Sequence, residues 1–186
     1  MKLRWSRAAY AAVDRRRRAL AGSALLSMAL PLAQAAEPIV KNGVVLLQSS
    51  AVLEERVASV DAMARYIQAV EAAARVAVQG GAVKQAIAGF IVIAVKPGLK
   101  SRVWLDFDTL LDPGTDRRLV ASISALAPFE ARKGPVVFAL KVSLWGGRES
   151  RRVAPAPAQW RAATKQAGRQ LDIDGMIQRV WREPDA

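Results

Sequence analysis

The sequence predicts a small α+β domain, in which an antiparallel sheet packs against one or two amphipathic helices and a C-terminal helical arm follows. Three observations support this fold class. Apolar residues recur every three or four positions from Leu53 to Val78, as on one side of a helix. Residues 89–95 form a short, wholly apolar run, and an alternating segment follows it after a Pro-Gly turn. Residues 135–145 form a second long run rich in β-branched residues.

The first 35 residues have the three parts of a secretory signal peptide. Arg15–Arg18 end a basic stretch, residues 19–30 are apolar, and Ala33-Gln34-Ala35 forms a small-x-small cleavage site. The apolar stretch is shorter than the roughly 20 residues that span a bilayer. We therefore expect cleavage near Ala35 and a periplasmic or secreted protein. The alternative is an uncleaved signal that anchors the protein in the inner membrane.

The export route stays open between two classes of signal. Arg16-Arg17-Arg18-Ala19-Leu20 resembles a twin-arginine signal, which implies that the protein folds before export. Ala19 departs from that pattern, because those signals favour Phe at this position. An ordinary Sec signal with additional arginines is the alternative.

The composition excludes several kinds of chemistry. The chain contains no Cys and no His, so zinc, haem and iron–sulfur sites lack their usual ligands, and His-based catalysis is impossible. We therefore expect no cofactor and no metal. The net charge is +12, of which residues 1–35 contribute half, because they hold seven basic residues and one acidic residue. The remaining charge of +6 is compatible with an anionic membrane surface as partner.

The first half of the domain begins with Asn42-Gly43 between apolar pairs. This dipeptide predicts either a small hairpin or a turn that enters one strand over residues 44–48. Ser49 or Ser50 can cap the helix that follows, and Gly80-Gly81 ends it. A break near residues 59–61 would divide this long helical stretch into two shorter helices.

A β-hairpin follows, with its turn at Pro97-Gly98. We expect its sheet to be covered on one face only. Alternation in the second strand separates two sets of side chains, Val103, Leu105 and Phe107 on one face and Arg102, Trp104 and Asp106 on the other.

The second half begins with Asp112-Pro113, in which Asp caps a helix and Pro occupies its first position. A strand over 135–145 ends at Gly146-Gly147. Two helical pieces joined near 172–175 then pack on the body or on a partner. The predicted organisation is a signal peptide (1–35), an α+β domain (36–147), a basic, Pro-rich linker (148–157) and a C-terminal helical segment (158–186).

One resemblance covers about residues 60–146. Tyr66–Val70 near a helix end, the hairpin from Phe90 to Phe107, and Ala127-Pro128-Phe129 before the last strand resemble the C-terminal domain of TonB energy transducers. The resemblance implies a module that recognises an extended peptide by adding a strand to a sheet edge. It does not imply energy transduction, because a transducer needs a permanent anchor and a long Pro-rich spacer.

Aromatic and Arg residues, which are enriched at interface hot spots, supply the candidate binding site. We predict an exported, non-enzymatic interaction or accessory protein that contacts an envelope protein or peptide through a sheet edge or the helical arm. Nucleic acid is not an expected partner of an exported protein. Alternatively, Trp104 and Trp145 form a second small core beneath the C-terminal helices. The candidate binding residues are Arg102, Trp104, Trp145, Arg148, Arg151, Arg152 and Trp160.

Two alternative functions rest on other residues. A hydrolase would use paired carboxylates after the hairpin, among Asp106, Asp108, Asp112 and Asp116. A peripheral binder of anionic lipid or glycan would use the basic residues between Arg148 and Arg161. Asp172-x-Asp174-Gly175 matches the start of a calcium loop but lacks its remaining ligands, so we interpret it as a turn between helices.

Overall fold

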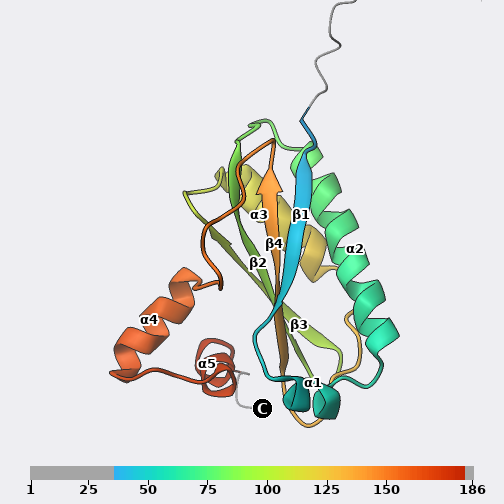
Figure 1. Ribbon diagram of the computed structural model, residues 1–186, viewed down its shortest axis with the longest axis vertical. Helices are drawn as coiled ribbons and strands as arrows, with labels where there is room; N and C mark the ends of the chain where they lie inside the picture. Colours follow the sequence, from blue (N-terminus) through green and yellow to red (C-terminus); the bar gives the residue numbers. More distant parts are fainter. Residues whose placement is uncertain (1–35, 183–186) are drawn as a thin grey trace, which may run out of the picture. The chain divides into compact units, whose positions relative to one another are not determined.

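The structure, a computed structural model, describes residues 36–182, which belong to one compact unit (Figure 1). The predicted signal peptide lies outside the described residues. The described chain forms an α+β fold, as predicted, with five helices and one four-stranded antiparallel sheet. The sheet has the order β1-β4-β2-β3 and consists of β1 (Ile39–Leu46), β2 (Ile87–Lys96), β3 (Lys100–Phe107) and β4 (Val136–Leu144).

The two central strands are apolar on both faces. Every residue of β2 except Lys96 is buried, as in a strand covered on both faces. The predicted hairpin is also confirmed, since β2 pairs antiparallel with β3 from Gly89 opposite Phe107 to Lys96 opposite Lys100. Gly98 has a φ of 82°, the left-handed conformation that the turn between these strands requires.

β1 is one continuous strand, so the alternative of a hairpin at Asn42-Gly43 is wrong. Its pairing with β4 shifts between Lys41 and Gly43, which marks a β-bulge. The Asn42 side chain donates a hydrogen bond to Ser143 Oγ at 2.7 Å. The physical reason is that β4 offers a partner along the whole of β1, and the bulge absorbs the extra residue.

The first face of the sheet is covered by α1 (Ser50–Arg56), α2 (Val60–Gln79) and α3 (Pro113–Ser124). The predicted break in the long helix is confirmed at residues 57–59, and Ser59 caps α2 through the Ala62 N–H. Asp112 caps α3, as predicted. The core on this side is apolar and includes Tyr66, Val70, Val78, Leu119, Ile123, Ile91, Ile93 and Phe138.

The second face is covered by α4 (Ala158–Ala167) and α5 (Ile173–Val180), so the expectation of one uncovered face is wrong. Figure 1 shows these two helices on the opposite side of the sheet from α2. The reason is that β2 and β4 are apolar on both sides, and burying the second side stabilises the fold by about 25 cal/mol per Å². The second core comprises Phe90, Val92, Ala94, Trp104, Val137, Ala139, Trp160, Ala163, Met176 and Ile177.

Candidate functional site

Trp104 and Trp160, two of the predicted binding residues, belong to the second core. Trp104 is 6% exposed and Trp160 is 5% exposed. Their rings meet edge to face, with centroids 5.6 Å apart and planes at 72°. The Trp104 indole N–H donates to Gln159 Oε1 at 2.9 Å. The alternative of a second core beneath the C-terminal helices is therefore confirmed for Trp104.

Arg102 and Arg152 hold the C-terminal segments onto β3. The Arg102 guanidinium lies over the Trp104 ring, 5.3 Å from its centroid, and donates to the Val180 carbonyl at 2.8 Å. Arg152 forms ion pairs with Asp106 at 2.6 Å and with Asp108 at 2.9 Å. Asp106 is 6% exposed, so Arg152 neutralises a buried carboxylate, and both arginines are structural.

The remaining three candidates do not join this cluster. Trp145 packs against the first core, beneath the Lys84 ammonium at 5.1 Å, so its expected place in the second core is wrong. The reason is its φ of 49°, which breaks the alternation of β4 directly after Leu144. Arg148 and Arg151 are exposed.

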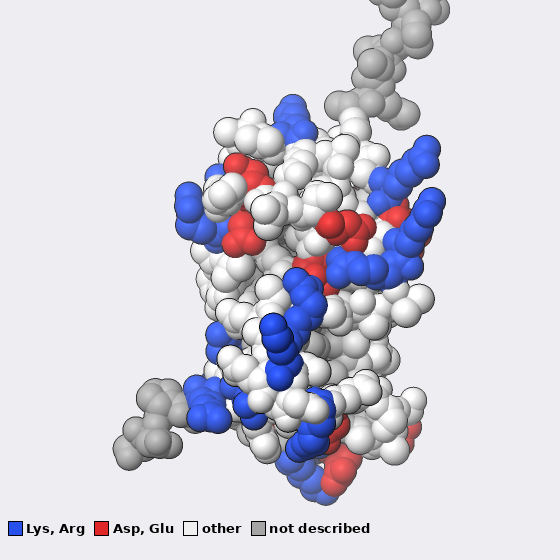
Figure 2. Space-filling view, turned by 90° about the vertical axis from the view of Figure 1, so that its left-hand side faces the viewer, with Lys and Arg blue, Asp and Glu red and all other residues white. Residues whose placement is uncertain are grey.

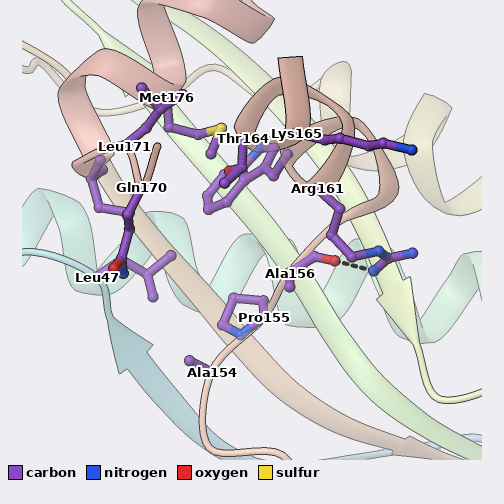
Figure 3. Close-up of a pocket in the computed structure, with 12 residues that line it drawn as sticks. Leu47, Ala154, Pro155, Ala156, Arg161, Thr164, Lys165, Gln170, Leu171 and Met176 are labelled. Atoms are coloured by element: carbon purple, nitrogen blue, oxygen red, sulfur yellow. Dashed lines mark hydrogen bonds between the residues drawn. The ribbon is translucent and has the colours of Figure 1, made fainter. Parts of the chain in front are cut away.

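A groove of about 710 Å³ lies between α4, α5 and the extended segment 154–156, and we call it the α4–α5 groove. The segment contains Pro155 between two alanines, so only small side chains line the groove there. Figure 3 shows Leu171 and Met176 on one side of the groove and Pro155 and Ala156 on the other. The lining residues are Leu47, Ala154, Pro155, Ala156, Trp160, Arg161, Thr164, Lys165, Gln170, Leu171, Ile173 and Met176.

The charged and polar groups of the α4–α5 groove come mainly from α4. Arg161 donates to the Ala156 carbonyl and lies 3.7 Å from Asp106 Oδ1. Lys165 is exposed, and in Figure 3 its side chain extends to the same side as that of Arg161. The buried Trp160 Nε1 has no hydrogen-bond partner among the described residues. Two cations therefore accompany an apolar lining.

The outer edge of β1 is the second exposed feature with a recognisable binding chemistry. No strand of the described residues pairs with this edge. The Leu47 N–H donates to the Val137 carbonyl, so by alternation the backbone groups of Val44 and Leu46 point away from β4. Val44 is 40% exposed and Leu46 is 51% exposed. The sequence predicted contact through a sheet edge without identifying this one, although the alternating Val44 and Leu46 in a short strand were the available signal.

An apolar recess of about 370 Å³ adjoins this edge. It lies where the end of β1 meets α1 and the start of α2, and exposed Glu54 also lines it. Its apolar lining consists of Leu46, Leu53, Val57, Val60 and Met63.

The acidic residues after the hairpin do not form one site. Asp112 accepts the Thr115 N–H at 2.9 Å as the cap of α3, and this bond holds the pKa of Asp112 below its usual range. Asp106, Asp108 and Asp116 line a separate recess that does not include Asp112. Within residues 36–182, no cluster of three acidic side chains is arranged to hold a metal ion.

Asp172 directly precedes α5, and Asp174 lies in the first turn of that helix, so this segment begins a helix where the sequence suggested a turn between helices. Asp172 accepts the Gly175 N–H at 2.9 Å and caps α5. Asp174 accepts two hydrogen bonds from the Arg56 guanidinium, at 2.7 and 2.6 Å, so α5 is tied to α1. The same contact lowers the pKa of Asp174, since Arg56 stabilises its ionised form.

The α4–α5 groove and the outer edge of β1 are thus the two candidate binding sites of residues 36–182. The groove has a partly buried apolar lining with two cations beside it, and the edge of β1 has exposed apolar side chains beside an apolar recess. Comparison of this chain with protein families, with characterised proteins and with solved structures finds no match.

Proposed function

We propose that the protein is an exported, non-enzymatic interaction protein that binds an extended segment of an envelope protein or peptide along the outer edge of β1. One observation carries the proposal: the outward backbone groups of Val44 and Leu46 lie beside exposed apolar side chains and an apolar recess. An added strand would pair with those backbone groups, and its alternate side chains would enter the recess.

The surroundings of β1 define the chemistry of the partner. The recess accepts an apolar side chain between Leu53, Val57 and Met63. Glu54 at its rim favours a basic residue in the bound segment. The opposite edge, β3, is less suited, because its apolar side chains are buried or half-buried and charged residues protect it.

The C-terminal arm is not the proposed contact, because Arg102, Arg152 and Trp160 are used inside the fold. A carboxylate hydrolase is also disfavoured, since Arg152 pairs with Asp106 and Asp108. The export step of the proposal rests on the sequence of residues 1–35. Among the helices of residues 36–182, none has the length and apolar character to cross a bilayer.

The test is a selection of nine-residue peptides from a display library on the wild-type protein and on two edge variants. Val44→Pro removes an N–H that points away from β4, and Leu46→Lys places a charge beside the recess. We expect selected peptides to alternate apolar and polar residues and to bind both variants at least tenfold more weakly. Leu110→Lys, at a 93% exposed position in the loop after β3, is the matched control.

Two outcomes contradict the proposal. The first is a selection without enrichment on the wild type, and the second is enriched peptides that bind Val44→Pro as tightly as the wild type. Light scattering at several concentrations tests whether a second copy of the chain occupies the edge instead, since Val44→Pro would then dissociate a dimer.

A further inference from the structure

We propose that the α4–α5 groove binds a single-chain amphiphile with an anionic head group. This site lies on the second face of the sheet, away from the edge of β1 in the proposed function, and does not depend on it. The lining of the groove and the charges at its rim support this assignment.

The lining suits the apolar chain of such a molecule. Leu171, Ile173 and Met176 line the groove from α5 and the turn before it, and Leu47 lines it from the end of β1. The volume of about 710 Å³ falls within the usual range of small-molecule sites. An apolar chain in the groove would remove these side chains from water without any rearrangement of the sheet.

The charges at the rim select an anionic head group. Arg161 and Lys165 are the two charged residues among the twelve that line the groove, and none of the twelve is acidic. Asp106 lies 3.7 Å from Arg161 and offsets part of its charge, so Lys165 supplies the excess. Figure 2 shows a band of basic side chains that runs down the lower half of this side of the molecule. This arrangement attracts an anion and repels a cationic amphiphile.

Trp160 lines the groove as an apolar residue. Its side chain is 5% exposed, and its Nε1 is buried away from the groove's solvent, so it offers no donor to a ligand. Arg161, Thr164 and Lys165 lie on successive turns of α4, so one head group can contact several of them.

Calorimetry with four dodecyl compounds below their micelle concentrations tests the proposal on the protein. We expect dodecanoate and dodecyl phosphate to bind, dodecan-1-ol to bind at least fivefold more weakly, and dodecylammonium not to bind. The two anions distinguish a carboxylate head from a phosphate head. Lys165→Glu should weaken anion binding five- to tenfold, whereas Arg169→Glu, an exposed residue outside the groove, should not change it.

Two further variants locate the binding. Thr164→Trp fills the groove and should abolish binding, while Ala162→Trp, at an exposed position of α4 that does not line the groove, should preserve it. Circular dichroism establishes that each variant is folded.

The proposal is overturned if neither anion binds, if the alcohol binds as tightly as the anions, or if Thr164→Trp binds as the wild type does. Val44→Pro, the variant that blocks the edge of β1, should bind dodecanoate unchanged. Failure of the amphiphile site and failure of the peptide site are therefore distinguishable.

Discussion

The two faces of the sheet are covered by helices of different length and of different origin in the chain. On the first face, α2 has 20 residues and α3 has 12, and both connect strands of the sheet. On the second face, α4 has 10 residues and α5 has 8, and both follow the last strand. A helix rises about 1.5 Å per residue, so α2 spans about 30 Å and α4 only about 15 Å.

The consequence is a difference in how completely each face is filled. The long helix α2 lies along β1 and β4 and buries one continuous apolar stripe. The shorter α4 and α5 leave the α4–α5 groove between them, and polar contacts from Arg102 and Arg152 complete the attachment. Two short helices that follow the last strand can therefore cover a sheet face and still leave an accessible apolar groove.

The largest expected effect comes from ending the chain at Gly147. This truncation removes Trp160, Met176 and Ile177 and exposes Phe90 and Val92 on the second face. Each fully buried side chain of this size contributes about 1.5–3 kcal/mol, so the total approaches the 5–15 kcal/mol of a typical domain. We expect the truncated protein to lose its cooperative thermal transition and to bind the dye ANS. A transition at the wild-type midpoint would show that the first core is sufficient alone.

A matched pair of core variants compares how the helices on each face contribute to stability. Ile123 of α3 and Ile177 of α5 are both fully buried, and replacing either by Ala should cost about 2–5 kcal/mol in the free energy of unfolding. The local effects should differ, because α5 has fewer elements packed around it. Hydrogen exchange should accelerate mainly in α4 and α5 for Ile177→Ala, and throughout the domain for Ile123→Ala. Identical exchange patterns would mean that the two faces open as one unit.

The smallest effect concerns the ion pair between Arg56 of α1 and Asp174 of α5. Asp174→Asn should cost about 1 kcal/mol, because the Asp174 side chain is 39% exposed and solvent weakens the pair. Since Arg56 lowers the pKa of Asp174 from its usual 3.8, the ionised pair stabilises the fold above that value.

The effect of this pair should depend on pH. As pH falls below about 4, protonation of Asp174 removes the contribution, so the wild type and Asp174→Asn should converge in denaturant titrations. Glu130→Gln, at an exposed acidic position, should match the wild type at every pH. A difference between wild type and Asp174→Asn that stays constant from pH 7 to pH 3 would contradict this account.

Features of the fold that depend on neighbouring residues were predictable from the sequence. The Pro97-Gly98 turn, the Asp112-Pro113 start of α3 and the break before α2 each follow from local backbone chemistry. The bulge at Asn42 was not predictable in the same way, because its partner Ser143 is 101 residues away. Local sequence favoured a turn there, and strand pairing across the sheet overruled it.

The candidate sites were less predictable for the same reason. Arg152 donates a hydrogen bond to Asp106, which is 46 residues away in the sequence. Trp104 donates one to Gln159, which is 55 residues away. Four of the predicted binding residues, Arg102, Trp104, Arg152 and Trp160, are therefore structural. The prediction placed Trp145 on the wrong face of the sheet. Its φ of 49° is rare for a residue other than glycine, and the neighbouring sequence does not predict it. The α4–α5 groove joins Leu47 to residues more than 100 positions later, which only the folded chain brings together.

The position of α4 and α5 after all four strands also has a consequence in time. The four strands and the helices of the first face are complete in the sequence by residue 144, before α4 and α5 begin. Phe90 and Val92 on the second face stay in contact with water until residues 158–180 have followed. Every unfinished copy therefore displays an apolar surface of the kind that chaperones and proteases recognise. Packing of α4 and α5, with Ile177 fully buried, removes this apolar surface from water.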